Sequence, residues 1–403
     1  MRILYLADIR FPLERANGIQ TMETCHALAE RGHGVSLVVR PDSQAPPRDP
    51  FAYYGLPRTD RLVIERAPVS GPPAARRLGY LAFAAGRAAG RARADLVLTR
   101  DLGVAAMLCR MPRTLRPPLV FESHGYAPAV AASLPELVAT AGAASSRKLA
   151  RLARREARVW RDADGYVTIT AGLAQELSAR HGSRPRVVVV PDGARPEEGV
   201  RLKDEETRPY SGDRENEPGL PLVAYAGHLY PWKGVEILLE ALALVSSSRG
   251  LIVGGHPAEP DLARVKAAAA RMGLDPRVTF TGLVEPARVA GFLRQADVLV
   301  LPNPASAISS RYTSPLKLFE YLAAGRPIVA SDLPAVREVV HDGQEALLVP
   351  PGDPRAMAGA ITRVLEDSAL AGRLAQAASE LASHYSWGRR AERLEALFRQ
   401  IVG

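Results

Sequence analysis

Short runs of consecutive apolar residues recur along the chain, and the longer segments between them carry apolar residues at helical spacing. In the first half the runs predict strands at Ile3–Ala7, Val35–Val39, Leu62–Glu65, Leu96–Thr99, Leu119–Glu122, Gly165–Ile169 and Val187–Val190. Strands that alternate with helices form a parallel sheet with helices on both faces. The pattern therefore predicts an α/β domain over residues 1–195.

A polar and highly charged segment, residues 196–219, interrupts this alternation, and we expect it to be an exposed linker. The alternation then resumes, with strands predicted at Leu222–Tyr225, Leu251–Val253, Val278–Phe280, Val298–Leu301, Ile328–Ala330 and Ala346–Val349. The pattern indicates a second α/β domain over residues 220–385, so that two Rossmann-like domains face each other across a cleft. In such sheets ligands bind beyond the carboxyl ends of the strands.

The segment "YTSPLKLFEYLAAGRPIVASDLP", residues 312–334, predicts a helix followed by a buried strand. Ser314 can cap the helix, Pro315 suits its first position, and Gly325 can end it. Free backbone N–H groups at the start of a helix bind anions, because that end carries about half a positive charge. The segment therefore predicts an anion site at its beginning, and an ordinary capped core helix is the alternative interpretation.

The chain has 403 residues, of which 47% are hydrophobic and 24% are charged. This composition is typical of a globular protein. Cys25 and Cys109 lie in apolar periodic segments, which is typical of reduced thiols in a cytosolic protein and gives no metal-binding spacing. The N-terminus "MRILYLAD" lacks the apolar core of a signal peptide, and no stretch reaches the roughly 18 apolar residues of a membrane span. We expect a cytoplasmic protein.

The formal net charge of +9 comes largely from arginine-rich segments, which indicates an anionic partner. The segment "RKLARLARREARVWRDAD" predicts one helix with an apolar face and a cationic stripe formed by Arg151, Arg154, Arg155 and Arg158. Such a stripe suits peripheral docking to an anionic membrane surface, and a solvated arginine-rich surface is the alternative. A second basic segment, residues 74–95, is similar. Neither has the interleaved aromatic residues that stack on bases, so we expect no nucleic-acid partner.

Several motifs, taken in order, are similar to one family of enzymes. They are "FESHG", "VVVVPDGA", "VAYAGHLYPWKGVEILLEAL", "LIVGGHP", "VTFTGLVEPARVAGFLRQADVLVLPNP", "SPLKLFEYLAAGRPIVASDLPAVREVV" and "YSWGRRAERLEALFRQIV". The chain resembles, over nearly its whole length, the retaining glycosyltransferases of family 4, also called glycosyl transferases group 1. The resemblance implies a GT-B fold whose closing helix, here residues 386–403, crosses back to the first domain.

The resemblance also implies a site for a nucleotide sugar. Glu320 would bind the ribose hydroxyls, the backbone N–H groups from Ser314 to Leu316 would hold the diphosphate, and Lys233 would neutralise the leaving phosphate. His124 would lie near the transferred sugar. The other positions that match the donor site are Gly18, His228, Leu283, Tyr312, Pro315 and Lys317. For Lys233, Glu320, His124 and His228, a purely structural role on the surface or near the core is the alternative interpretation.

Two positions depart from the family pattern. The first acid of the family's Glu-x7-Glu motif falls at Tyr312, which has no carboxylate to accept hydrogen bonds from sugar hydroxyls. The usual Gly-Arg-Leu is here Gly227-His228-Leu229, so a histidine whose charge depends on pH replaces a permanent guanidinium. These departures indicate either altered specificity or lost activity.

We expect no metal cofactor, because lysine and backbone N–H groups would meet the phosphate charge. The "DAD" motif at Asp162–Asp164 matches the acid motif of metal-dependent transferases, but a tripeptide of this kind occurs by chance in a chain of this length. The expected function is transfer of a sugar from a UDP- or GDP-linked donor to a glycan or lipid-linked acceptor, in cell-surface polysaccharide or glycolipid synthesis. The alternatives are a nucleotide-sugar epimerase on the same fold and a non-catalytic nucleotide-sugar-binding subunit.

Overall fold

The computed structural model of the chain describes residues 1–89, 94–137, 142–195, 219–311 and 316–403. The strands of the first domain are β1 (Arg2–Arg10), β2 (Gly34–Arg40), β3 (Leu62–Arg66), β4 (Leu96–Thr99), β5 (Leu119–Ser123), β6 (Gly165–Thr168) and β7 (Val187–Val189). Its helices are α1 (Ala16–Glu30), α2 (Pro50–Tyr54), α3 (Pro73–Ala88), α4 (Leu102–Leu108), α5 (Ala127–Leu137), α6 (Ser146–Asp162) and α7 (Ala171–His181). The strands form one parallel sheet in the order β3-β2-β1-β4-β5-β6-β7.

The strands of the second domain are β8 (Leu222–Ala226), β9 (Arg249–Val253), β10 (Val278–Gly282), β11 (Val298–Leu301), β12 (Ile328–Ser331) and β13 (Leu347–Val349). The short 3-10 helix η1 (Pro231–Lys233) follows β8. The α-helices are α8 (Val235–Leu244), α9 (Asp261–Arg271), α10 (Pro286–Arg294), α11 (Ala307–Arg311), α12 (Leu316–Ala324), α13 (Pro334–Arg337), α14 (Pro354–Glu366) and α15 (Ser368–His384). The sheet order is β10-β9-β8-β11-β12-β13, again parallel throughout.

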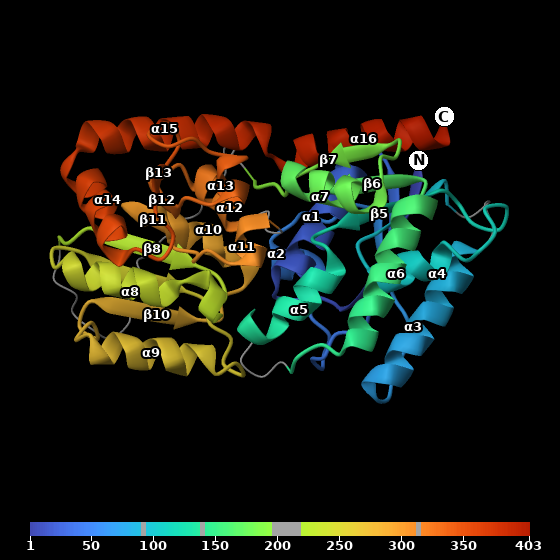
Figure 1. The fold of residues 1–403 in the computed structure, drawn as a ribbon, viewed down its shortest axis with the longest axis horizontal. Helices are drawn as coiled ribbons and strands as arrows, with labels where there is room; N and C mark the ends of the chain where they lie inside the picture. Colours follow the sequence, from blue (N-terminus) through green and yellow to red (C-terminus); the bar gives the residue numbers. More distant parts are fainter. Residues whose placement is uncertain (90–93, 138–141, 196–218, 312–315) are drawn as a thin grey trace.

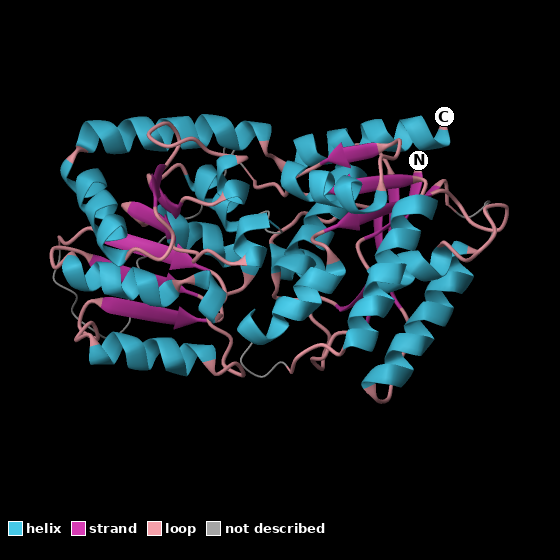
Figure 2. Cartoon of the chain, in the orientation of Figure 1, coloured by secondary structure: helices cyan, strands magenta, loops and turns pink. Residues whose placement is uncertain are grey.

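Helices cover both faces of each sheet, and the burial pattern of the strands explains this arrangement (Figure 2). Ile3 and Tyr5 of β1 belong to one buried cluster, whereas Leu4 and Leu6 belong to another. Successive side chains of a strand point to opposite faces, so a continuous apolar run needs a core on each side. The two-domain α/β prediction is confirmed. Every predicted strand is present, and β1 extends beyond its predicted end to Arg10.

The last helix, α16 (Trp387–Val402), lies beside the first domain, whereas α15 lies along the second (Figure 1). The apolar side chains of α16 join the core that β1 and α1 form; they are Trp387, Ala391, Leu394, Leu397 and Phe398. Ala194, at the end of the first domain, exchanges backbone hydrogen bonds with the junction of α15 and α16, from Ala194 N to Tyr385 O (2.9 Å) and from Trp387 N to Ala194 O (3.2 Å). The end of the first domain is therefore bonded to the junction at which the chain returns to that domain.

The predicted linker, residues 196–219, lies outside the described residues except for its last position. Cys25 is buried, Cys109 is half-buried, and both are free thiols. Within the described residues, no helix has the length and apolar character needed to cross a membrane.

The cationic stripe of α6 has three exposed arginines, Arg151, Arg154 and Arg155, while Arg158 is half-buried. The second basic segment is different, because Arg77 of α3 donates to Asp101 (2.7 and 2.8 Å) and to Asp8. The charge of Arg77 is thus neutralised inside the first domain, whereas the stripe of α6 presents three arginines to solvent.

Candidate active site

The carboxyl ends of strands from both sheets meet at a cavity of about 350 Å³. The first domain contributes the loops after β1, β4, β5 and β7, and the second domain contributes those after β8, β9, β10 and β11 together with the start of α12. The cavity lies where parallel α/β sheets bind their ligands. Of the sequence-predicted site residues, those that line it are His124, His228, Lys233, Leu283, Leu316, Lys317 and Glu320.

Lys233 reaches the cavity from the loop after β8. Its ammonium lies 3.6 Å from the centroid of the Trp232 ring, a cation–π arrangement. Gly234, which follows, has φ +73°, and a Cβ there would lie 1.9 Å from Pro302 O, so only glycine fits the turn that presents Lys233. Burial lowers the pKa of Lys233 to about 7, because an uncompensated ammonium is costly at the cavity wall.

Lys317, in the first turn of α12, points at the same cavity from the other side. Its ammonium lies 4.0 Å from the centroid of the Tyr225 ring and donates to the Tyr225 hydroxyl. Gly227 leaves the space that this side chain occupies, since a Cβ there would lie 2.0 Å from Lys317 Cε. Burial and then the charge of Lys233 lower the pKa of Lys317 well below its ordinary value.

These two lysines give the cavity its electrostatic character. Among the described side chains, neither ammonium forms a salt bridge with a carboxylate. The charge of Lys233 lowers the pKa of Lys317, and burial lowers the pKa of both lysines. A bound anion between them would favour both charged forms. The pair is therefore suited to bind a phosphate or another compact anion.

Glu320 lies one turn beyond Lys317 on α12 and also lines the cavity. Burial raises the pKa of its carboxyl to about 7, the charge of Lys317 opposes this shift, and Glu23 adds to it. An ionised carboxylate accepts hydrogen bonds only, so it would bind neighbouring hydroxyl groups such as those of a ribose. The position of Glu320 is compatible with the ribose contact that the family resemblance implies.

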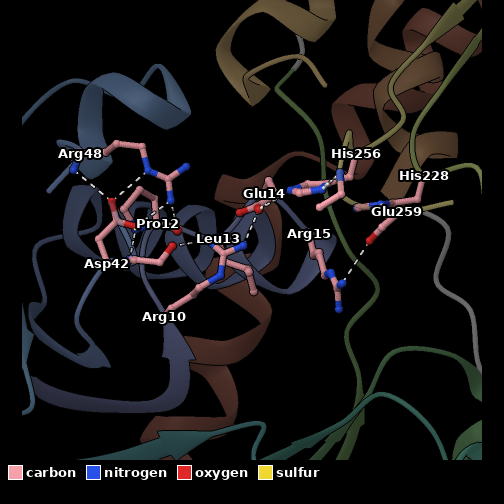
Figure 3. A network of polar contacts seen from close by, with 12 residues as sticks. Arg10, Pro12, Leu13, Glu14, Arg15, Asp42, Arg48, His228, His256 and Glu259 are labelled. Atoms are coloured by element: carbon pink, nitrogen blue, oxygen red, sulfur yellow. Dashed lines mark hydrogen bonds and ion pairs between the residues drawn. The ribbon is translucent and has the colours of Figure 1, made fainter. Parts of the chain in front are cut away.

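His228 is tied to a polar network that crosses the cleft (Figure 3). Its Nδ1 lies 3.4 Å from Glu259 Oε2, and its ring stacks on Tyr230 with the centroids 5.0 Å apart. Glu259 also accepts hydrogen bonds from Tyr230 (2.7 Å) and from Arg15 of the first domain (3.1 Å). Burial lowers the pKa of His228, so this ring is a weaker cation than the arginine that is usual in the family.

A second ion pair joins the two domains beside this network. His256 Nε2 lies 3.3 Å from a carboxylate oxygen of Glu14, which also accepts from Arg10. On the opposite side of the cleft, Glu338 accepts hydrogen bonds from the backbone N–H groups of Ala171 (2.7 Å) and Gly172 (2.9 Å) at the start of α7. These contacts hold the two domains together around the cavity.

His124 follows β5 and faces the cavity from the first domain. Its Nε2 lies 2.6 Å from Oε1 of Glu122, a carboxylate with no exposed surface. Because an ionised carboxylate can only accept, Nε2 carries the proton of this bond, and Nδ1 keeps its lone pair when the ring is neutral. Burial and the charge of Arg100 lower the pKa of His124, whereas Glu122 raises it.

Gly18 lies in the first turn of α1 and is not among the residues that line the cavity. A Cβ at this position would lie 2.2 Å from Leu13 O and 2.5 Å from the Tyr54 hydroxyl. Close packing of the loop after β1 therefore explains this glycine, where the family resemblance implied an approach of phosphate. Three further expected site residues, Tyr312, Ser314 and Pro315, lie outside the described residues.

The cavity also contains polar residues that the sequence interpretation missed. Arg100 follows β4, Asp192 follows β7, and Asn303 follows β11, and all three line the cavity. Gln20, from α1, lines it as well and accepts a hydrogen bond from Arg100 (2.8 Å). The first three come one or two residues after predicted strands, where ligands bind in parallel α/β sheets, so this rule could have located them.

The described residues contain no group of three or more histidine, cysteine or acidic side chains arranged to hold a metal ion. The "DAD" motif comes before β6, at the amino end of that strand. Asp164 accepts from Arg116 (2.8 Å) and from the backbone N–H of Leu119 (2.9 Å), and Asp162 pairs with Arg161 (2.7 Å). Both carboxylates thus have structural partners away from the cavity.

Two parallel-sheet domains whose strand ends meet at a cavity between them have the architecture of the GT-B class of fold. Two family models match the chain: "Glycosyl transferase 4-like domain" over residues 18–193 and "Glycosyl transferases group 1" over residues 220–367. The chain belongs to the glycosyl transferases group 1 family.

Curated relatives match part of the chain. Alpha-D-kanosaminyltransferase of Streptomyces kanamyceticus is 32% identical over 210 residues, which are 50% of this chain and 52% of that protein. D-inositol 3-phosphate glycosyltransferase of Acidothermus cellulolyticus is 31% identical over 265 residues, which are 61% of this chain and 55% of that protein. The chain thus spans little more than half the length of these two relatives.

Solved structures match nearly the whole chain. Sucrose-phosphate synthase from Thermosynechococcus elongatus superimposes with a TM-score of 0.76 at 21% identity, covering 99% of this chain and 98% of that one. The Anabaena protein HepE in complex with UDP-glucose gives a TM-score of 0.69 at 18% identity, covering 99% of this chain and 100% of that one. These matches show the GT-B fold.

Proposed function

We propose that this protein is a retaining hexosyltransferase that takes a sugar from a nucleotide diphosphate and transfers it to a glycan or lipid-linked acceptor. The observation that carries the proposal is the convergence of Lys233 and Lys317 on one cavity between the domains, without a salt-bridged carboxylate among the described side chains. Two neighbouring ammonium groups of this kind require an anion for full charge, and a diphosphate supplies one.

The lysines would act on the leaving group. As the bond from the sugar to the diphosphate breaks, the phosphate oxygen takes the bonding electrons, and an acceptor hydroxyl forms the new bond and loses its proton. Preorganised hydrogen-bond donors that face the developing charge lower the activation barrier. Loss of one such hydrogen-bond donor costs about 2.7–4 kcal/mol in a well-studied case. Because the ammonium groups supply this charge, we propose that turnover needs no divalent metal.

The nucleoside is proposed to lie at the second domain, with Glu320 on the ribose and Leu283 beside the base. The Leu283 side chain is 43% exposed at the edge of the cavity, so a base bound there could cover it. The structural neighbour that was solved with UDP-glucose supports a UDP-linked donor. A GDP-linked donor is the second possibility to test.

The acceptor is proposed to enter from the first domain, where α6 presents Arg151, Arg154 and Arg155 to solvent. Each cation near an anionic membrane surface contributes about 1 kcal/mol, so these side chains favour peripheral docking and a lipid-linked acceptor in cell-surface glycan or glycolipid synthesis. Flotation with vesicles of phosphatidylcholine and phosphatidylglycerol tests this point. Binding that salt abolishes supports docking, and no binding at low salt contradicts it.

The decisive experiment measures nucleotide release from UDP-, GDP-, ADP- and dTDP-sugars in the presence of EDTA. Turnover of one donor, lost in both Lys233→Ala and Glu320→Ala but retained in the exposed-surface control Lys266→Ala, would support the proposed site and name the donor. Conversion of the donor without an acceptor product would indicate an epimerase. Tight binding with no turnover of any donor would indicate a non-catalytic nucleotide-sugar-binding subunit.

A further inference from the structure

The closing helix α16 places one buried arginine beneath the cavity. Arg390 is 3% exposed and uses all three of its guanidinium nitrogens. Nε donates to Thr24 Oγ1 of α1 (3.1 Å), and Nη1 donates to the backbone carbonyls of Val190 (2.8 Å) and Pro191 (2.7 Å). Nη2 donates to Oε2 of Glu122, at 2.6 Å. The side chain is thus held by α1, by the segment after β7 and by β5.

The carboxylate of Glu122 connects this arginine to the cavity. Its Oε2 accepts from Arg390, and its Oε1 accepts from Nε2 of His124 (2.6 Å) and from Nε2 of Gln20 (2.5 Å). Glu122 has no exposed surface, so water cannot replace any of these partners. An unbroken series of hydrogen bonds therefore runs from the closing helix through Glu122 to the ring of His124, which lines the cavity.

The charges along this series balance. Arg390 and Glu122 form a buried ion pair with no net charge, and this leaves His124 free to be neutral. The other charged groups that face His124 are Arg100, which disfavours its protonation, and Asp192, which favours it. The paired carboxylate also selects one tautomer, because it accepts the Nε2 proton and leaves the lone pair on Nδ1.

We propose that Arg390 is a positioning residue that keeps Glu122 ionised and His124 in the neutral tautomer protonated at Nε2, so that Nδ1 can accept a hydrogen bond from a substrate hydroxyl. The role of that hydroxyl rests on the proposed function, but the protonation state of His124 belongs to the free protein. Without the guanidinium, the buried carboxylate keeps only His124 and Gln20 as partners. The Glu122–His124 pair would then take up a proton, and an imidazolium has no lone pair to offer.

A purely structural anchor would behave differently. If Arg390 only fastened α16 to the first domain, its replacement would lower the melting temperature without changing the titration of His124. The two roles are therefore separated by a measurement on the histidine ring.

The experiment is a ¹⁵N-histidine NMR titration of the full chain, with the His124 resonances assigned by their absence in His124→Gln. In the wild type we expect a neutral ring protonated at Nε2 at pH 7. In Arg390→Met we expect the proton affinity of His124 to rise at least tenfold, and in Arg390→Lys, which keeps the charge, we expect it to stay near the wild-type value. Arg389→Met is the matched control, because Arg389 is on the same helix, 62% exposed, and paired with Glu392 at the surface.

Unchanged titration of His124 in folded Arg390→Met would overturn the proposal. If Arg390→Met does not fold, the wild-type spectrum still decides, because an imidazolium or a ring protonated at Nδ1 at pH 7 contradicts the assigned state. Where a donor is turned over, the acid limb of the kcat/KM profile should move up by at least one pH unit in Arg390→Met, with little change in donor KM. Absence of turnover would count against the proposed function alone, since the NMR result does not depend on it.

Discussion

Donor binding is expected to change the protonation of the cavity, because two of its groups have a pKa near neutrality in the free protein. Burial lowers the pKa of Lys233 to about 7, and burial raises the pKa of Glu320 to about 7 against the opposing charge of Lys317. A diphosphate beside Lys233 favours the ammonium, and ribose hydroxyls that donate to Glu320 favour the carboxylate. Lys233 therefore takes up protons on binding, and Glu320 releases them.

The balance between these two effects changes sign with pH. A group whose pKa is 7 is roughly nine-tenths protonated at pH 6 and roughly one-tenth protonated at pH 8. At pH 8 Lys233 takes up roughly 0.9 proton and Glu320 releases roughly 0.1. At pH 6 Lys233 takes up roughly 0.1 proton and Glu320 releases roughly 0.9. Net uptake should therefore rise by roughly 1.6 protons between pH 6 and pH 8. A diphosphate would favour the ammonium form of Lys317 as well, because burial lowers its pKa well below the ordinary value.

Isothermal titration calorimetry in buffers of different ionisation enthalpy measures this exchange. The ligand is intact UDP-glucose, or a GDP-linked sugar if GDP binds instead, with EDTA and without acceptor, because the phosphates of an intact donor do not titrate near neutrality. Lys233→Met should remove roughly half of the pH dependence and Glu320→Gln the other half. Lys266→Met, on the exposed side of α9, should reproduce the wild type. Equal proton exchange at pH 6 and pH 8 in the wild type would refute the reasoning.

Three further predictions concern activity, cavity shape and domain contact. Lys233→Ala should reduce turnover about a hundredfold or more, measured as nucleotide release, because one donor to the leaving phosphate is lost; a decrease of less than tenfold would contradict this role. Gly227→Ala should weaken donor binding, measured by calorimetry, because its Cβ would displace Lys317, whereas Gly273→Ala, also at positive φ but with no atom within 4 Å, should leave binding unchanged. Glu338→Gln should increase the radius of gyration in solution scattering, because its contact with the start of α7 weakens; an unchanged radius would show that other contacts keep the cleft closed.

Most of the fold could be predicted because buried parallel strands leave a signal in single short segments. The runs at β4 and β11 are buried at every position, and their predicted bounds agree with the structure. His124 directly follows a strand, so the same local reasoning reaches it, whereas Lys233 was predicted from the resemblance to family motifs. Asp192 and Arg100 obey that rule too and were overlooked among many acidic and basic residues.

Arg390 could not be found in this way. Its partner Glu122 lies 268 positions away, and the chain contains many arginines at helical spacing. For Gly18 the resemblance implied an approach of phosphate, which stays a prediction, while the structure shows close packing against Leu13 and Tyr54. Local patterns report burial and strand ends, whereas pairing across the chain depends on the tertiary structure.

The contact between Ala194 and the junction of α15 and α16 also bears on how the molecule can move. Because the end of the first domain is hydrogen-bonded to this junction, opening would be a rotation about that point, with little sliding. A pivot of this kind acts as a lever: a small rotation there separates the Glu14–His256 and Arg15–Glu259 pairs by a larger distance. Arg390 lies one helical turn beyond the pivot, so the centre of the domain rotation and the support of His124 belong to the same short segment of α16.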